Sequence, residues 1–298
     1  MERPLISICC ITYNHEPYIR ECLDGFLMQQ TKFTIEILIH DDASTDGTSE
    51  VIREYQEKYP DVIFPVIQTE NQYSKGVRGI NIHYNFPRAK GKYIALCEGD
   101  DYWTDPLKLQ KQVDVLESDS SIAICFHDAN VKNELDSSFL DFYEALNKSI
   151  PNKVTTFENL IEANYLPTLS VLFRNINEPL PIGFFKFTVG DWPLHLLNSR
   201  FGNIYFLNEK MAVYRIHAGG VHRNGEGWNL KRKLIELRNE VSILNMLKDE
   251  VDKKHLLLIQ KRKKGIYIYS LKLIIRTVFL RNLKIYKIAI NFKKRIKL

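Results

Sequence analysis

The first 118 residues alternate between short apolar runs and segments with helical spacing, and this alternation restricts the fold more than any other feature of the chain. Strands are predicted over 5–14, 35–44, 62–67 and 92–101, and helices over 15–30, 48–59 and 107–117. Strands that alternate with helices predict an α/β fold with a mostly parallel sheet flanked by helices. In such sheets, ligands bind at the carboxyl ends of the strands.

Polar side chains gather at three of these strand ends. They are Thr12, Tyr13 and Asn14 after the first strand, Asp41 and Asp42 after the second, and Glu98, Asp100 and Asp101 after the fourth. One strand that ends in acidic residues would mean little. Three such ends predict one shared site at this edge of the sheet.

The last cluster is the densest, because residues 97–106 read CEGDDYWTDP and place three carboxylates in four positions. Like charges this close repel one another and shift each other's pKa unless a cation or a set of donors holds them. We therefore expect a positive group here. Asp105, which precedes Pro106, is interpreted instead as the start of a helix.

Composition narrows the class of protein. A chain of 298 residues with 45% hydrophobic composition can bury a full core. Fifteen of the 41 Lys and Arg residues lie between 253 and 298, where there is no Asp or Glu. Residues 1–252 thus hold 26 basic and 36 acidic side chains, a net charge of about −10, so an acidic body carries a basic tail.

Cysteine usage predicts the compartment. None of the five cysteines has CxxC spacing, and all lie in the first half of the chain: Cys9, Cys10, Cys22, Cys97 and Cys125. This pattern predicts reduced, buried thiols in a cytoplasmic protein rather than a disulfide framework or a zinc site. The first residues show no secretion signal. No GxGxxG follows the first strand and no P-loop pattern occurs, which argues against a dinucleotide-dependent oxidoreductase.

Five stretches carry a family resemblance: SICCITYNHEPYIRECLDGFLMQQ, ILIHDDASTDGT, KGKYIALCEGDDYWTDPLKLQKQVD, GDWPLHLL and MAVYRIHAGGVH. Over about residues 4–222 they resemble the inverting glycosyltransferases of family 2, which have the GT-A fold. One segment departs from the family pattern. Before the acidic motif, Asn-x-Gly-x-x-x-Ala-Arg-Asn is replaced by NQYSKGVRGINIHYN, so the resemblance gives little support for Lys75 or Arg78 as phosphate contacts.

The resemblance implies a nucleotide-diphosphate sugar donor, in the first instance UDP-linked. It assigns Asp42 to uracil N3, and it places Thr12, Tyr13, Asn14 and Asp41 around the nucleotide. The residue types alone also suit an Asx-type turn at Asp41 and Asp42 that leads into the next helix. For Asp41 and Tyr13 the two interpretations are about equally supported.

A leaving diphosphate requires charge neutralisation, which Mg²⁺ or Mn²⁺ supplies as a Lewis acid. Such ions take one or two protein carboxylates. The resemblance implies that Asp101 ligates the metal directly, that Asp100 contacts the ribose or a metal-bound water, and that His217 reaches the metal or the diphosphate. Without the resemblance, a loop histidine is more often a solvated side chain. Glu98 and His222 receive no firm assignment.

The acceptor hydroxyl requires a base. Asp191 in VGDWPLHLL is the candidate, and Trp192 beside it is an aromatic residue able to stack on a sugar. The alternative interpretation makes Asp191 only the cap of a helix that has Pro193 in its first turn, and both interpretations can hold together.

Together these observations predict a GT-A domain over 1–222 and a basic helical extension over 223–298. The expected activity is inverting transfer of a sugar from a nucleotide donor to a saccharide or lipid-linked acceptor, in surface polysaccharide assembly. The alternative is a non-catalytic, membrane-associated nucleotide-sugar-binding protein. A nucleic-acid-binding module is not expected, because the core is acidic where a metal would bind.

The tail GIYIYSLKLIIRTVFLRNLKIYKIAINFKKRIKL mixes aliphatic and aromatic residues with Lys and Arg. Its charges interrupt the apolar run far short of the roughly 20 residues that a spanning helix needs. The pattern is typical of helices that lie at an anionic membrane surface, here the inner face of the cell membrane. The alternative is a helical hairpin packed on the catalytic domain or on a second subunit, so the oligomeric state stays open.

Overall fold

The computed structural model describes residues 3–145, 151–176, 178–181, 183–187, 190–220 and 229–296, with side chains in the last helix described as far as Phe279, Val278 excepted. The chain divides into two compact units, Met1–Asn224 and Gly225–Leu298.

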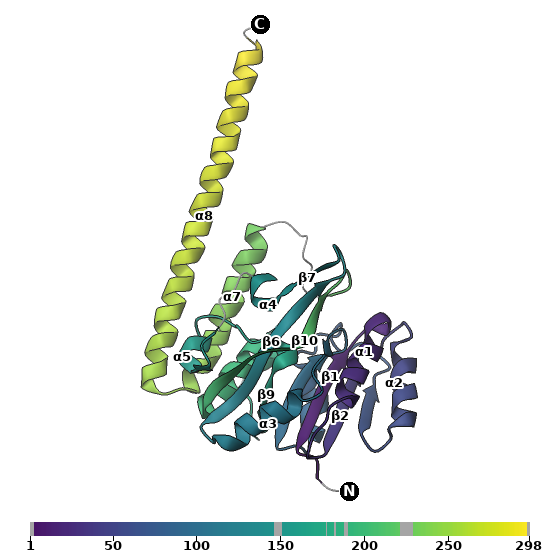
Figure 1. Ribbon diagram of the computed structural model, residues 1–298. Helices are drawn as coiled ribbons and strands as arrows, with labels where there is room; N and C mark the ends of the chain where they lie inside the picture. Colours follow the sequence, from purple (N-terminus) through teal and green to yellow (C-terminus); the bar gives the residue numbers. More distant parts are fainter. Residues whose placement is uncertain are drawn as a thin grey trace. The chain divides into compact units, whose positions relative to one another are not determined.

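The first unit holds one sheet of ten strands with helices around it (Figure 1). Its strands are β1 Ile6–Thr12, β2 Ile35–Asp41, β3 Ile63–Ile67, β4 Tyr93–Glu98, β5 Tyr102–Trp103, β6 Ile122–Asn133, β7 Ser138–Asp141, β8 Val154–Thr155, β9 Leu172–Arg174 and β10 Asn203–Ile216. Its α-helices are α1 Glu16–Leu27, α2 Thr48–Lys58, α3 Lys108–Ser118, α4 Phe142–Ala145, α5 Phe157–Leu160 and α6 Asp191–Asn198, and a π-helical turn, η1, covers Asn81–Asn85.

The strand order in the sheet is β3-β2-β1-β4-β9-β6-β10-β5, with β7 added to β6 and β8 added to β10. The strands β3, β2, β1 and β4 run parallel to one another, as the alternation of strands and helices predicts. The other half is mixed: β9 is antiparallel to β4 and β6, whereas β10 is parallel to β6. The α/β class is therefore confirmed, and the prediction of a mostly parallel sheet holds for the first half only.

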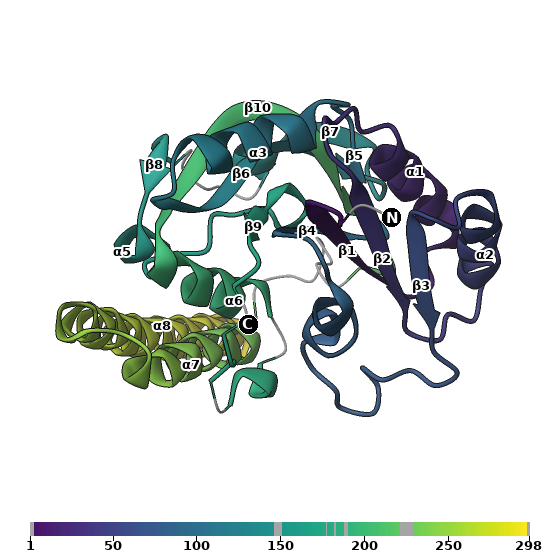
Figure 2. The same cartoon turned by 90° about the horizontal axis from the view of Figure 1, so that it is seen from below.

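Helix α1 shows how the sequence builds the layer beside the first strands (Figure 2). Its residues Ile19, Cys22, Leu23 and Phe26 recur at helical spacing and are all fully buried. Gly25 lies on the same face, and a Cβ atom there would come within 2.9 Å of the backbone nitrogen of Trp103. Glycine thus lets α1 approach β5 closely.

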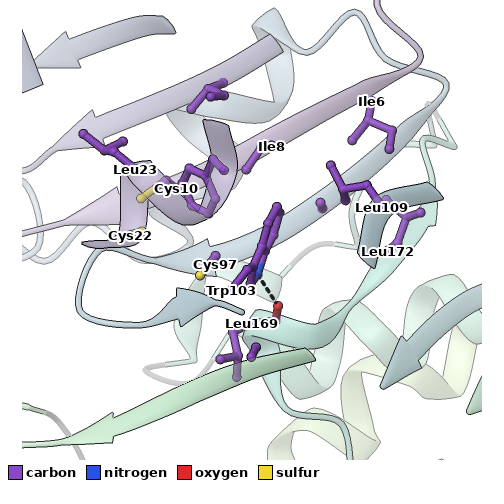
Figure 3. Packing of buried hydrophobic residues seen from close by; sticks show 14 of the residues in the cluster. Ile6, Ile8, Cys10, Cys22, Leu23, Cys97, Trp103, Leu109, Leu169 and Leu172 are labelled. Atoms are coloured by element: carbon purple, nitrogen blue, oxygen red, sulfur yellow. Dashed lines mark hydrogen bonds between the residues drawn. The ribbon is translucent and has the colours of Figure 1, made fainter. Parts of the chain in front are cut away.

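Trp103 anchors the turn between β4 and β5 in the core. Its ring lies 4.7 Å from that of Phe26, and its indole N–H donates to the carbonyl oxygen of Leu169 at 2.8 Å (Figure 3). Burying an aromatic ring of this size contributes roughly 2–3 kcal/mol. Of the acidic cluster, Glu98 is the last residue of β4, and Asp100 and Asp101 lie in the turn between β4 and β5.

The second unit consists of two long helices, α7 Leu230–Met246 and α8 Lys253–Ile296, joined by a short turn. Within it, Arg262 of α8 donates to Glu240 of α7 at 3.2 Å, and Ile259 and Ile266 of α8 are buried. None of the helices in the described part of the chain combines the length and the apolar composition of a bilayer-crossing segment.

Candidate functional site

The carboxyl ends of β1, β2 and β4 lie side by side. In register, Thr12 is paired with Asp41, and Ile11 with Glu98. The amide of Asp42 then donates to the carbonyl oxygen of Thr12 at 3.0 Å. All three polar clusters therefore lie along one edge of the sheet, where α/β proteins bind ligands.

Asp100 stands at the centre of this edge. Its Oδ2 atom lies 3.0 Å from Nε2 of His217 and 3.6 Å from Nε2 of His15. The three side chains offer one ligand atom each, all within 4.8 Å of one another. Burial opposes ionisation of Asp100, but the hydrogen bond to His217 and the two imidazoles hold its pKa below the usual value. Burial also opposes the charged form of His15, and it lowers the pKa of His15 although the charge of Asp100 acts to raise it.

Carboxylate oxygen and imidazole nitrogen are ligands that suit a divalent first-row transition ion. The group of His15, Asp100 and His217 is therefore a candidate cation site. His15 is absent from the sequence-based prediction, although it directly follows the first polar cluster and directly precedes α1.

Asp101 is not part of this group. Its Oδ1 atom accepts the backbone N–H of Arg215 at 2.8 Å, and its Oδ2 atom is buried without a partner in the described chain. Burial and the charges of Asp100 and Glu98 raise its pKa well above the usual value. The structure thus brings Asp100, rather than the expected Asp101, together with His217.

The acidic run at 98–101 predicts a positive group beside it, and the chain itself supplies one, the guanidinium of Arg215. Arg215 is 4% exposed, and one of its guanidinium N–H groups donates to the carbonyl oxygen of Asp100 at 2.7 Å. It was missed in the sequence although it stands two residues before His217. For Glu98 the described residues show no such partner, and burial, with the charges of Asp100 and Asp191, raises its pKa.

The side chains of Asp41 and Asp42 both accept hydrogen bonds from other residues of the chain. Asp41 accepts from the N–H and hydroxyl of Ser44 and from the hydroxyl of Ser49, as the Asx-turn interpretation predicts. Asp42 accepts the backbone N–H groups of Gln72 at 2.8 Å and Tyr73 at 2.9 Å. The carboxyl group of Asp42 therefore fixes the segment that departs from the family pattern.

That segment folds on itself. Lys75 forms an ion pair with Glu70, and the guanidinium of Arg78 stacks 4.1 Å above the ring of Tyr73. Both cations thus have local partners in this segment or directly beside it.

The first polar cluster divides into three kinds of position. The Thr12 hydroxyl is buried and has no partner among the described residues, whereas the Tyr13 ring is exposed. Asn14 has a positive φ of 55°, and its Oδ1 accepts the backbone N–H of Thr45 at 2.8 Å. Asn14 thus holds the turn before α2, while Thr12 and Tyr13 offer groups to a ligand.

Asp191 is the first residue of α6, so the predicted helix start is confirmed. The N-cap is Gly190, however, and α6 has no side-chain cap hydrogen bond, so the interpretation of Asp191 as the cap is wrong. Its Oδ2 accepts from the side-chain amide of Asn164 at 2.9 Å, and its Oδ1 is buried without a partner among the described residues. Its charge acts on Glu98, which places both carboxyl groups in one electrostatic environment.

The expectation for Trp192 needs correction. Its ring is 6% exposed, and its indole N–H donates to the carbonyl oxygen of Leu160 at 2.9 Å. A ring packed in this way holds α6 in place and offers no free face to a sugar. His222 lies outside the described residues.

Several buried side-chain polar atoms lack a hydrogen-bond partner among the described residues, and some of them belong to residues discussed above: Thr12 Oγ1, His15 Nδ1, Asp101 Oδ2 and Asp191 Oδ1. Native proteins leave few buried polar atoms without a partner, so atoms of this kind are typical of a site that a ligand or ordered water completes.

Comparisons with known proteins agree with this geometry. The family model for Glycosyl transferase family 2 matches residues 7–178. An uncharacterized protein of Mycobacterium tuberculosis is 39% identical over 242 residues. The match covers 78% of this chain and 64% of that relative, so this chain spans less than two thirds of the relative's length. TuaG of Bacillus subtilis, whose name refers to teichuronic acid biosynthesis, is 26% identical over 83% of this chain and 92% of its own length.

Two solved structures share the fold. TarS of S. aureus (residues 1–349) in complex with UDP-GlcNAc has a TM-score of 0.59 at 16% identity, covering 89% of this chain and 72% of that one. The mannosyltransferase PcManGT of Pyrobaculum calidifontis in complex with GDP-Man and Mn²⁺ has a TM-score of 0.55 at 16% identity, covering 96% and 82%. The fold is thus the GT-A fold, and with a family match over more than half of its length this chain belongs to glycosyl transferase family 2.

Proposed function

We propose that this chain transfers a sugar from a nucleotide-diphosphate donor, UDP-linked, to a hydroxyl group of a saccharide or lipid-linked acceptor. The observation that carries the proposal is the convergence of His15, Asp100 and His217 on one edge of the sheet, in electrostatic reach of the carboxyl groups of Glu98 and Asp191. That edge offers a place for a cation, a nucleotide and a base together.

The donor set fits a divalent ion, and the two imidazoles favour Mn²⁺ over Mg²⁺. His15, Asp100 and His217 would hold it. When bound, the ion would neutralise the negative charge of the leaving diphosphate. The complex of PcManGT with GDP-Man and Mn²⁺ supports the choice of ion.

The nucleotide is assigned to the edge formed by Thr12, Tyr13 and Asp42. The hydroxyl of Thr12 has no protein partner, and the exposed Tyr13 ring suits stacking on a base. Asp42 already accepts two backbone N–H groups, yet a carboxylate has about four lone-pair positions and can also accept uracil N3–H. The complex of TarS with UDP-GlcNAc supports uridine as the nucleoside.

Asp191 is proposed as the general base. Asn164 holds one of its oxygens, which leaves Oδ1 to accept a proton from the acceptor hydroxyl. The acceptor oxygen then forms a bond to the anomeric carbon of the sugar as the bond from that carbon to the diphosphate oxygen breaks. The electron pair of the broken bond leaves with the diphosphate, so a single displacement inverts the anomeric configuration.

The second unit supports a membrane contact. Its helix α8 has no acidic residue and exposes several large apolar side chains: Leu257, Tyr267, Ile268, Tyr269, Leu271, Ile275 and Phe279. We assign α8 to the anionic inner face of the cell membrane, where each nearby Lys or Arg adds roughly 1 kcal/mol. A lipid-linked acceptor in surface polysaccharide assembly would be reached there, and the name of TuaG supports that pathway.

Thermal unfolding with a panel of nucleotide sugars, with and without Mn²⁺, tests the proposal. A true donor stabilises the protein by mass action, by about 2.7 kcal/mol at a hundredfold excess over Kd. We expect a UDP-sugar to raise Tm, and to raise it further with Mn²⁺. If none of the nucleotide sugars shifts Tm under either condition, the proposed donor site is wrong.

The second candidate function is binding of a nucleotide sugar without transfer. The observation that would favour it is the structural use of Asp42 by residues 72 and 73. The unpaired Oδ1 of Asp191 argues for catalysis instead. Measured turnover of the bound donor separates the two functions.

A further inference from the structure

We propose that Arg215 is a positioning residue that holds Asp100 and His217 in the geometry that binds the ion. The inference rests on the proposed function, because it concerns the same cation site. Arg215 is not one of the three candidate ligands, and it acts through two of them.

Arg215 is bonded to both residues of the acidic pair. Its guanidinium donates to the carbonyl oxygen of Asp100 at 2.7 Å, and its backbone N–H donates to Oδ1 of Asp101 at 2.8 Å. It is also the second residue before His217 on the same chain segment, since β10 ends at Ile216. One residue thus sets the distance between the two ligands.

The guanidinium is fixed from the other sides as well. A second N–H forms an ion pair with Glu21 of α1, and Nε lies 3.7 Å from the carboxylate of Glu134 beyond β6. The rings of Tyr102 and Tyr18 lie 4.3 Å and 5.1 Å from its central carbon. The planar group is therefore surrounded by two carboxylates and two aromatic rings, which come from α1, from β5 and from the segment after β6.

Burial of a guanidinium costs desolvation free energy, so we expect the contacts of Arg215 to serve a purpose other than stability. Ion pairs in an interior often contribute little net stability, because desolvation offsets their attraction. The arrangement instead suits a role in orienting Asp100 and His217, and residues that hold metal ligands in this way typically control about 10- to 100-fold in metal affinity.

Arg215 could affect cation binding through its charge or through its position, and the choice of substitution separates the two. If Arg215 acted only through its charge, removal of the charge would strengthen cation binding, and Arg215→Lys would leave binding unchanged. If it acts by position, Arg215→Lys keeps the charge but loses the planar fork that reaches Asp100 and Glu21 at once. The lysine variant is therefore the decisive one.

The experiment measures Mn²⁺ binding by electron paramagnetic resonance on the full chain. We expect Arg215→Lys to weaken Mn²⁺ binding by about 10-fold or more, as for other residues that hold metal ligands. Arg20→Lys is the matched control, because Arg20 also donates two hydrogen bonds to a glutamate, Glu54, but on the exposed side of α1 and α2. The control should bind Mn²⁺ like the wild type.

A second variant keeps the test valid if Arg215→Lys fails to fold. Glu21 is about half exposed and contributes one partner of the guanidinium, so Glu21→Gln leaves the core intact. We expect it to weaken Mn²⁺ binding measurably, by less than the roughly 10-fold expected for Arg215→Lys because the contact with Asp100 is kept, with an unchanged Tm. Wild-type affinity in both variants would overturn the positioning role alone. No Mn²⁺ binding by the wild type would overturn the proposed cation site itself, and the inference with it.

Discussion

The Nε2 atom of His217 lies 3.0 Å from the Oδ2 atom of Asp100, although 117 positions separate the two residues in the chain. One lies in the turn after β4 and the other directly after β10, on strands that are not neighbours in the sheet. The contact therefore depends on the complete sheet, and it is the reason why Asp100, rather than Asp101, is proposed as the carboxylate of the cation site.

The first prediction compares these two adjacent residues. Asp100→Asn should weaken Mn²⁺ binding at least 10-fold more than Asp101→Asn does, because only Asp100 shares the site with His15 and His217. Calorimetric titration with Mn²⁺ measures both affinities on folded protein. The reverse order would return the ion to Asp101, as the family resemblance implies.

The second prediction concerns the base. Asp191→Asn should lower kcat by about 100-fold or more, while the affinity for the donor stays near that of the wild type. The amide keeps the hydrogen-bonding shape next to Asn164 but cannot accept the proton of the acceptor. Steady-state kinetics, together with donor binding by fluorescence, measures both quantities. A collapse of donor affinity would place Asp191 in the donor site instead.

The third prediction concerns His195, one helical turn after Asp191. Its imidazole is fully buried, neither ring nitrogen has a partner among the described residues, and burial lowers its pKa to about 4 despite the nearby charge of Asp191. The unfolded chain takes up this proton near pH 6.5, whereas the folded protein takes it up only near pH 4. The free energy of unfolding should therefore fall as the pH falls through this window.

Replacement of His195 by leucine removes that contribution. Across the window, the wild type should lose up to about 3 kcal/mol more than His195→Leu. Urea unfolding at both ends of the window measures the difference. The matched control is His83→Leu, at an exposed histidine of η1, and it should follow the wild type. Parallel curves for all three proteins would show that His195 is not held neutral by the fold.

The fourth prediction concerns α8. Lys272 and Arg276 are exposed on this helix among apolar side chains, so reversing both charges to glutamate should weaken binding to anionic vesicles by about 10-fold or more. Vesicle sedimentation at low and high salt measures it. Arg53→Glu combined with Lys58→Glu, both on the exposed face of α2, is the control for net charge. Equal binding by all variants would favour a contact with a second subunit.

The first half of the fold was predictable because its signals are local. Strand and helix periodicity placed β1, β2, β3 and β4 to within a few residues, and parallel pairing then brought their polar ends together. The second half was not, because the pairing of β6 with β10 joins segments some 80 residues apart, and no local pattern encodes it.

The candidate site shows the same division. Asp100 and His217 belong to recognisable motifs, whereas the contributions of His15 and Arg215 depend on which side chains the folded sheet brings into contact. The prediction that Trp192 stacks on a sugar differs from the structure for a related reason. A motif fixes the residue type but not whether the ring faces solvent or the core.

The central claim is sugar transfer at this edge of the sheet, and donor turnover tests it most directly. Release of nucleoside diphosphate from UDP- and GDP-sugars with Mn²⁺ should be measured for the wild type, Asp100→Asn and Asp191→Asn, with membrane extract as the source of acceptor. We predict turnover of one donor by the wild type, and rates lower by about 100-fold or more in both variants. A donor that the wild-type protein binds but never consumes would contradict the account and leave nucleotide-sugar binding without transfer.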